Sequence, residues 1–485
     1  MDKNFVTVRL TSPHFDCDRM QVRTLDGREA ISGGYSFVVE VVTLGESELI
    51  QSQVVAADVD IVFEEDGVEA RHVHGMVAQI DDLLDTEPDH HAYRIEIVPR
   101  TFRLSMVETQ EVFLDMSVPD IVRAKLAMVG IGDDAIDLRL AGTYAPREFV
   151  VQYRETDLAF VSRLTENVGI SYFFEQADGM EKLVLSDASS GHRPIVGDAN
   201  IPFRGRGDPR DVFRIERRVR MIPAVYVMQD YNYRTPRVDL TSTYESGVGS
   251  AGGVVEYGAH HKTPLEGMAL AAVRAEERES RHHYFEGDAA ICRFAAGATF
   301  DLVDHARLPD AKLLLVEVEH HVVQTVMSTA TGKESPYRCS FKAIEARRNY
   351  RPARVTPKPR IHGFLTATVE HELGEAPGLG RIARIDEHGR YMVRFHFDPG
   401  SAKRKRSSRP LRMVQPHAGP NYGMHFPLKP DAEVVVTFVD GDPDRPVIAG
   451  AVPNAVTASP VNRSNAMMHT IQTASGITIA MKDTP

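Results

Sequence analysis

Histidine is the residue type whose spacing in this chain most suggests chemistry, because adjacent pairs recur. The pairs are His90-His91, His260-His261, His282-His283 and His320-His321. Neighbouring side chains of a strand point to opposite faces, so adjacent histidines rarely share one metal ion. His72 and His74 would place two imidazoles on one face of a strand, yet no third ligand is evident and zinc needs three or four. We therefore interpret the histidines as ordinary polar or interface residues and predict no metal site.

Motifs of nucleophilic, phosphate-binding or zinc-dependent chemistry do not occur in the sequence. It contains no GxSxG, SxxK, GxxxxGK[ST] or HExxH segment. Carboxylates are plentiful, but the sequence does not show whether two of them lie at the separation that glycoside hydrolysis requires. We predict no catalytic residues and no cofactor, and we interpret the chain as a protein that is not an enzyme.

A basic cluster lies between residues 403 and 412. It consists of Lys403, Arg404, Lys405, Arg406, Arg409 and Arg412. OB-type barrels bind single-stranded nucleic acid through a cationic groove combined with aromatic stacking platforms. This cluster follows an Asp-Pro-Gly turn and is not interleaved with aromatic residues, which favours a solvated or subunit-facing loop. The formal net charge of −12 also disfavours nucleic acid as a partner.

Alternating apolar and polar residues run along much of the chain, which is the pattern of half-buried strands. Helical patterns are few: they cover residues 119–129, residues 156–168 and a third segment that begins at Thr263. Thr263 and Glu266 form a capping box with a proline in the first turn. The apolar stripe expected along this third helix consists of Leu265, Met268, Ala269, Ala272 and Val273. A few helices among many strands predict a mainly β protein of barrels with α/β insertions.

A proline-rich segment, residues 351–360, predicts a semi-rigid linker and a domain boundary. After it, residues 361–455 contain about five short strands, which is typical of a small closed barrel of the OB type. The clearest of these strands covers residues 391–397. Its apolar face carries Tyr391, Val393, Phe395 and Phe397. We expect residues 1–350 and 456–485 to form separate parts before and after the barrel.

Four segments carry a resemblance to a known family. They read FVVQYRETDLAFVSRLTENVGISYFFE, RPARVTPKPRIHGFLTATV, GRYMVRFHFDP and VQPHAGPNYGMHFPLKPDAEVVVTFVDGDPDRPVIAGAVPN, in that order along the chain. In this order they resemble the VgrG family of type VI secretion spike proteins. The resemblance implies paired β-barrels like those of a phage tail hub in residues 1–350 and an OB-fold domain in residues 361–455. It further implies that residues 456–485 begin a triple-stranded β-helix needle, of which most would lie beyond Pro485.

Two short alternating runs, residues 470–473 and 476–481, occupy the last part of the chain. One narrow hairpin cannot bury its apolar side by itself. Three copies wound together would bury Ile471, Ile477, Ile479 and Met481 along a common axis. The sequence therefore predicts a homotrimer with these four residues in its β-helix core.

The function that the resemblance implies is a structural trimeric spike that punctures target envelopes and carries effectors. Its implied partners are an Hcp-like tube ring, baseplate proteins, and a PAAR-like tip protein or effectors at the carboxy-terminal end. Two alternatives stay open: a hub-spike of a contractile phage tail or extracellular injection particle, and an effector-bearing spike whose enzymatic extension is absent from these residues.

The sequence also bears on where such a spike would act. Three cysteines without a CxxC pair fit folding in a reducing cytoplasm. No signal-peptide core and no run of about 20 apolar residues occurs, so we expect no stable membrane insertion. The expected route is assembly in the cytoplasm, followed by export through the contractile machine to the outside or into target cells.

Overall fold

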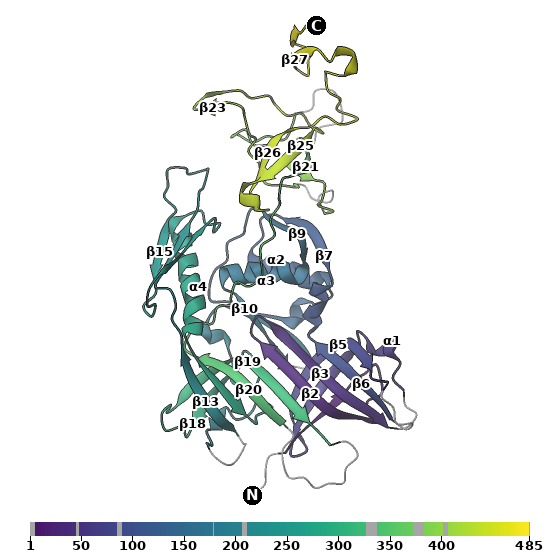
Figure 1. Ribbon diagram of the computed structural model, residues 1–485, viewed down its shortest axis with the longest axis vertical. Helices are drawn as coiled ribbons and strands as arrows, with labels where there is room; N and C mark the ends of the chain where they lie inside the picture. Colours follow the sequence, from purple (N-terminus) through teal and green to yellow (C-terminus); the bar gives the residue numbers. More distant parts are fainter. Residues whose placement is uncertain are drawn as a thin grey trace. The chain divides into compact units, whose positions relative to one another are not determined.

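The computed structural model describes residues 5–44, 48–84, 90–177, 179–205, 211–325, 337–371, 382–400 and 406–484. Within these ranges strands predominate and helices are few (Figure 1), which confirms the mainly β expectation. The chain divides into two compact units. The amino-terminal unit comprises Met1–Met106, Val122–Tyr144 and Leu158–Pro357, and the carboxy-terminal unit comprises Val107–Ile121, Ala145–Asp157 and Lys358–Pro485.

A large sheet forms the body of the amino-terminal unit, and twelve strands belong to it among the described residues. Its main path runs β1-β4-β5-β6-β3-β2-β19-β20-β17-β13, with β18 joining β19 and β12 joining β18. The bounds are β1 Val6–Thr11, β2 Met20–Ala30, β3 Gly34–Leu44, β4 Asp58–Glu65, β5 Val68–Asp82, β6 His90–Val98, β12 Asn200–Pro202, β13 Val212–Val219, β17 His283–Ala289, β18 Thr299–Val303, β19 Ala311–Val323 and β20 Tyr337–Glu345. Strand β19 pairs with both β2 and β20, so it joins strands from the two ends of this unit.

Alternation along these strands separates a buried face from a solvent face. In β3, Phe37, Val39 and Val41 are fully buried, while the residues between them are partly exposed. This period of two is what the pleat of a strand imposes on side chains. The apolar residues of the sheet therefore supply the core of the unit.

Two smaller α/β insertions complete the amino-terminal unit. The first contains β8 Ile136–Arg139, β10 Ser171–Ala177 and β11 Met180–Ser186, ordered β10-β11-β8, with most of α2 Val118–Met128 and α3 Asp157–Val168. The second contains β14 Val225–Gln229, β15 Ser242–Glu245 and β16 Gly253–Tyr257, ordered β15-β14-β16, with α4 Pro264–His282. One further short helix, α1, covers Gln51–Val54, and the 3-10 turns of this unit are η1 Arg100–Ser105, η2 Asp133–Ala135 and η3 Ser189–Gly191. The insertions confirm the expected decoration of a β framework by helices.

Helix α4 begins where the sequence predicts but buries a different face. The Thr263 hydroxyl accepts the backbone N–H of Glu266 at 3.2 Å, which confirms the cap. The predicted apolar stripe is wrong, because Leu265 is 78% exposed and Met268 is 52% exposed. The buried residues of α4 are Gly267, Ala271, Arg274, Ala275, Glu277 and Ser280. Small residues let the helix lie close to β14 and β15, and a buried Arg274–Glu277 ion pair of 2.7 Å fills the rest of that face.

The carboxy-terminal unit is centred on a four-stranded sheet ordered β22-β21-β25-β26. Its strands are β21 Phe364–Val369, β22 Val393–Phe395, β25 Glu433–Phe438 and β26 Pro446–Ala451. Isolated bridges such as Tyr391–Leu411 and Met413–Ile448 extend the pairing around it. Strands β25 and β26 follow one another along the chain and pair in antiparallel register. The remaining elements are β7 Glu108–Phe113, β9 Val150–Thr156, β23 Ala418–Gly419, β24 Tyr422–Gly423, β27 Met468–Gln472, β28 Thr478–Lys482, η5 Val439–Gly441 and η6 Arg463–Asn465.

Candidate assembly surface of the carboxy-terminal unit

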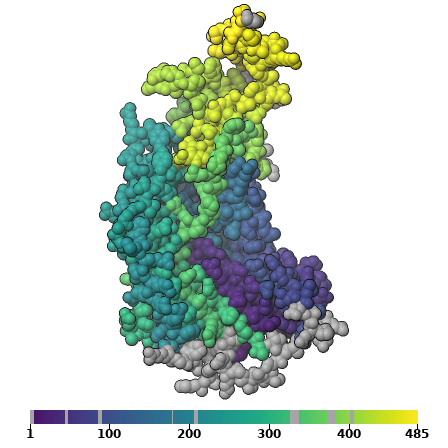
Figure 2. Space-filling view, in the orientation of Figure 1, coloured from purple at the N-terminus to yellow at the C-terminus, as the bar shows by residue number. Residues whose placement is uncertain are grey.

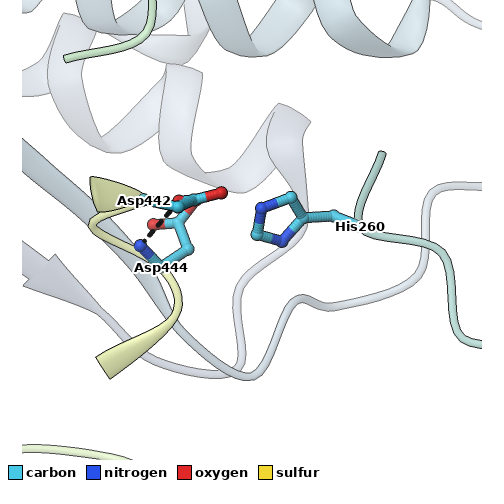
Figure 3. A group of neighbouring side chains, drawn as sticks. All are labelled: His260, Asp442 and Asp444. Carbon is cyan, nitrogen blue, oxygen red and sulfur yellow. Dashed lines mark hydrogen bonds between the residues drawn. The ribbon is translucent and has the colours of Figure 1, made fainter. Parts of the chain in front are cut away.

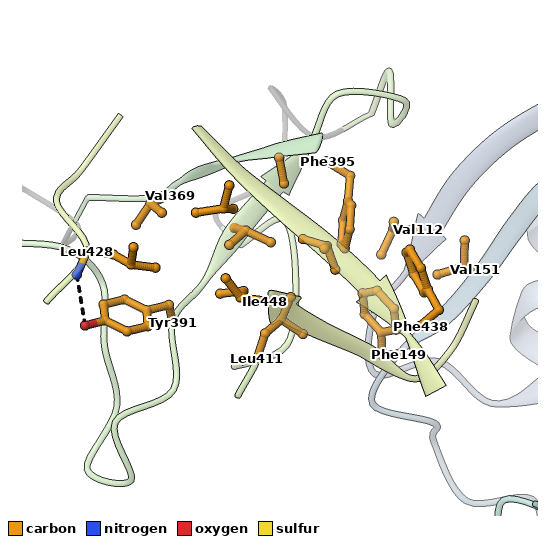
Figure 4. Close-up of a cluster of buried hydrophobic side chains, with 14 of the residues drawn as sticks. Val112, Phe149, Val151, Val369, Tyr391, Phe395, Leu411, Leu428, Phe438 and Ile448 are labelled. Carbon is orange, nitrogen blue, oxygen red and sulfur yellow. Dashed lines mark hydrogen bonds between the residues drawn. The ribbon is translucent and has the colours of Figure 1, made fainter. Parts of the chain in front are cut away.

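The core of the carboxy-terminal unit includes side chains from two distant parts of the sequence (Figure 4). As the alternation predicts, Tyr391, Val393 and Phe395 are buried in it. Val151 on β9 and Phe149 just before it are buried in the same cluster. The Phe149 and Phe395 ring centroids lie 6.2 Å apart. Strands β7 and β9 therefore pack onto the core of the carboxy-terminal unit, although they precede its four-stranded sheet by more than 200 residues in the sequence.

Two aspartates in the turn between β25 and β26 hold this assembly of segments together. The buried Asp444 carboxylate accepts the backbone N–H of Val151 at 2.7 Å and the Lys358 ammonium at 2.7 Å. Asp442 also binds Lys358, at 2.5 Å, and its carboxylate accepts the backbone N–H of Asp444 at 2.9 Å (Figure 3). His260, drawn in the same figure, belongs to the amino-terminal unit. The turn thus fixes β9 and the end of the proline-rich segment to the barrel.

The two alternating runs near the end of the chain form an antiparallel hairpin, β27–β28, as the sequence predicts. Ile471 lies opposite Ile479, and because alternate residues share a face, Ile477 and Met481 lie on that same side. The exposed fractions are 49% for Ile471, 68% for Ile477, 63% for Ile479 and 65% for Met481. This segment, yellow in Figure 2, lies at the surface. Its apolar face has no cover within the described residues of this single chain.

A second exposed apolar segment, which we call the arm, covers residues 414–427. All residues from 416 to 427 are exposed, and they include Tyr422, Met424 and Phe426. The arm is fixed at its base, where the His425 ring hydrogen-bonds to the Tyr391 hydroxyl at 3.1 Å. The sequence reasoning used this segment only for the family resemblance and did not predict that it forms an exposed apolar surface. The available signal is that residues 414–427 contain no charged side chain although they are not buried.

The basic cluster is partly engaged inside the same unit, although Lys403, Arg404 and Lys405 lie outside the described residues. Arg406 forms an ion pair with Asp115. The Arg409 guanidinium lies 5.6 Å from the Phe149 ring centroid and donates a hydrogen bond to the Asp444 carbonyl at 3.2 Å. These two arginines therefore stabilise the junction between the barrel and the segments around β7 and β9.

The histidines singled out by their spacing lie in different environments. His320 is buried, and its two ring nitrogens bind the Glu29 carboxylate at 2.8 Å and the Tyr337 hydroxyl at 2.7 Å. Burial lowers the pKa of His320, which favours the neutral ring. His261 is also buried and binds the Leu240 carbonyl at 2.6 Å. Both make the ordinary polar contacts that we expect from their sequence context, whereas His72 and His74 do share one face of β5, with ring centroids 5.9 Å apart.

The family model for the phage tail baseplate hub (GPD) matches residues 28–326. The chain belongs to this family. A second model, the type VI secretion system/phage-baseplate injector OB domain, matches residues 379–452 and agrees with the predicted OB-type barrel. The predicted VgrG resemblance is confirmed by relatives of that name.

Two such relatives are the type VI secretion system spike proteins VgrG1c and VgrG1a of Pseudomonas aeruginosa. Each is 28% identical to this chain over 452 residues, which is 91% of the chain but 61% and 69% of the respective relatives. The actin cross-linking toxin VgrG1 of Vibrio cholerae is 27% identical over 468 residues, 91% of this chain and 41% of the toxin. This VgrG-family chain therefore spans less than two thirds of VgrG1c.

Solved structures support the fold. The Escherichia coli c3393 protein, described as a type VI secretion component similar to phage T4 tail proteins gp27 and gp5, aligns with a TM-score of 0.64 at 21% identity. That alignment covers 92% of this chain and 99% of c3393. A Francisella PdpA–VgrG complex contains a chain that aligns with a TM-score of 0.61 at 10% identity, covering 99% of this chain and 76% of that one. The hub-like and OB-type architecture is thus the fold of this chain.

Proposed function

We propose that this VgrG-family chain works as a structural, trimeric spike at the tip of a type VI secretion tube. The observation that carries the proposal is the apolar face of the β27–β28 hairpin, which a single chain leaves exposed. Membership of the hub family and the similarity to VgrG spike proteins support the same role. In this role the trimer punctures a target envelope and carries effectors.

The hairpin alone provides a limited driving force for trimer assembly. Fully burying one such side chain contributes about 1.5–3 kcal/mol, and four side chains about half to two thirds exposed would contribute roughly 4–8 kcal/mol per copy. Association costs on the order of 4–15 kcal/mol in lost translational and rotational freedom. Additional apolar surface is therefore needed. The arm, with Tyr422, Met424 and Phe426, supplies more of it in the same unit.

The proposed work is mechanical and requires no catalytic residue, metal or cofactor. Strands closed into barrels and wound with sister copies leave few free sheet edges, which suits an element that must resist compression. The effector-bearing alternative concerns an enzymatic extension outside these residues, and the toxin relative of Vibrio cholerae, of which the alignment covers 41%, is compatible with it. We extend no activity of that relative to this chain.

The proposed partners follow the order of the two units. The amino-terminal hub would contact an Hcp-like tube ring and baseplate proteins, and the carboxy-terminal end would hold a PAAR-like tip protein or effectors. The Francisella VgrG complexed with PdpA is an example of a VgrG chain with a protein partner. The proposed route is cytoplasmic assembly followed by export through the machine. No helix in the described ranges is long and apolar enough to cross a membrane.

The match of residues 28–326 to the phage tail baseplate hub family supports the alternative of a phage tail or extracellular injection particle. A complementation assay separates the readings. A strain lacking its own copy of this spike is supplied with the chain, and release of the tube protein into the medium is measured. The proposal predicts that the wild-type chain restores release. Restoration of phage particles without tube-protein release would favour the alternative.

A matched pair of variants ties the assay to the hairpin. Ile477→Asp with Ile479→Asp places two charges on the apolar face, and we expect it to abolish release. Thr478→Asp with Ala480→Asp adds the same charges to the opposite face of the same strand, and we expect this control to keep most of the release. Equal activity of the two double variants would contradict the proposed role of the hairpin face.

A further inference from the structure

Strand β5 presents His72 and His74 on one face, at the wall of a cavity of about 830 Å³ in the amino-terminal unit. Their ring centroids lie 5.9 Å apart and the ring planes are inclined by 31°. The side chains are 36% and 19% exposed, so solvent ions can reach them. Segments from β10 and from around residues 193–196 and 293–298 line the rest of the cavity.

Each imidazole has one nitrogen held by its own carboxylate. His72 Nε2 lies 3.0 Å from Glu69 Oε2, and His74 Nδ1 lies 2.7 Å from Asp60 Oδ1. A carboxylate only accepts, so in the neutral ring the proton sits on the nitrogen that faces it. The lone pairs are thereby placed on Nδ1 of His72 and Nε2 of His74, and the hydrogen bonds found among the described residues involve neither of these two atoms.

From this arrangement we propose that His72 and His74 form a two-imidazole site for a divalent transition-metal ion of the Zn²⁺ type. Metal-binding histidines usually donate their other N–H to a carboxylate, which orients the ring and raises its basicity. Two rings bound at 2.0–2.1 Å to a tetrahedral ion lie about 5 Å apart between centroids. The present separation of the ring centroids, 5.9 Å, is within about 1 Å of that value.

The site offers two protein ligands, fewer than the three or four of a structural or catalytic zinc site, so it is a weak, exchangeable site whose other coordination positions are filled by water. Within the described residues, no three ligand atoms that include both rings lie within 4.8 Å of one another. Open positions are a feature of exchangeable zinc sites rather than of closed structural ones. The competing explanation is a pair of independent surface ion pairs, in which both rings are protonated and neither nitrogen can bind a metal. Metal binding does not depend on the proposed spike role.

The test is isothermal titration calorimetry of the full chain with zinc chloride at pH 7.5. We expect one binding event in the wild-type chain that is lost in His72→Ala with His74→Ala. We expect Asp60→Ala, which removes only the carboxylate partner of His74, to weaken that event by about 10–100-fold. The matched control is His90→Ala with His91→Ala on β6, where adjacent rings point apart, and it should bind zinc like the wild type.

A folding control keeps the result interpretable. His72→Ala alone removes the more exposed ring and should also abolish the event, while the melting temperature without metal stays near that of the wild type. The proposal is wrong if the double variant of His72 and His74 binds zinc with unchanged stoichiometry and affinity. The proposal is equally wrong if neither the wild-type chain nor the control variant of His90 and His91 shows a binding event at micromolar zinc.

Discussion

Glu181 on β11 is a buried acid whose pKa is raised by its burial, and Glu181→Gln tests this directly. The side chain is buried, its carboxyl group contacts the Tyr35 hydroxyl, and that hydroxyl also contacts the carbonyl oxygen of His74. Burial raises the pKa of Glu181 to about 7 and outweighs the opposing effect of its neighbours. The Tyr35 hydroxyl donates to the ionised carboxylate, and this contact, together with Arg100 and His74, lowers the pKa of Glu181. The protonated carboxyl donates to Tyr35 instead, which leaves the phenol proton for the His74 carbonyl oxygen.

The raised pKa fixes both the sign and the size of the expected effect. Between the ordinary pKa of 4.5 and about 7, the unfolded chain releases a proton that the folded chain keeps, so stability falls as pH rises through this window. The difference between 7 and 4.5 corresponds to roughly 3 kcal/mol at about 1.36 kcal/mol per unit. Glutamine keeps an N–H donor for Tyr35 and does not ionise. We expect Glu181→Gln to raise the free energy of unfolding by up to about 3 kcal/mol at pH 8 and by much less at pH 4.5.

Urea unfolding followed by circular dichroism at pH 4.5, 6 and 8, with a chelator present, measures this change. The matched control is Glu175→Gln on β10, because Glu175 accepts two N–H groups from Arg139 at 2.6 and 2.5 Å. That variant should lose stability at pH 8, the opposite sign. A variant of Glu181 that is no more stable than the wild type at pH 8, or whose gain does not shrink on acidification, would refute the reasoning.

Three further predictions concern packing and buried charge. Phe149→Ala should destabilise the carboxy-terminal unit by about 3–5 kcal/mol, although residue 149 lies far from the barrel sequence; faster hydrogen exchange in β25 would report it. Asp444→Ala removes the acceptor of Val151 and Lys358, and thermal unfolding should show a loss of about 1–3 kcal/mol or more. Arg274→Ala removes the nearest partner of the buried Glu277, which keeps only the longer ion pairs with Arg281 at 3.8 Å and Arg278 at 4.0 Å, and should cost up to about 3–5 kcal/mol in urea unfolding, in contrast to a near-neutral Leu265→Ala on the exposed face of α4.

Local patterns in the sequence predicted local structure well. The alternation of Tyr391, Val393 and Phe395 identified the buried face of the barrel, because the period of a strand is set by its own backbone. The cap at Thr263 identified the start of α4 for the same reason. The stripe through Leu265 and Met268 failed because the partner of α4 selects small residues and a buried ion pair, which residue hydrophobicity does not encode.

Features that depend on distant parts of the chain were not predictable in this way. The packing of Phe149 and Val151 into the barrel core leaves no mark in residues 361–455, since any apolar strand would satisfy the same pattern. Glu69, the carboxylate partner of His72, lies three positions earlier on the same strand. Asp60, the partner of His74, lies on the neighbouring strand β4, so only the register of β4 with β5 reveals that it lies beside His74. The division of the chain into parts at 1–350, 361–455 and 456–485, with a linker at 351–360, stays a prediction.

The central claim is that the β27–β28 hairpin finds its apolar partners in sister copies of the same chain. The native mass of the purified protein across a range of concentrations tests it most directly. We expect a species near three times 53.9 kDa for the wild type and a single-chain mass for Ile477→Asp with Ile479→Asp. A wild-type chain that keeps the mass of one copy at every concentration, with its hairpin protected from hydrogen exchange, would contradict the account.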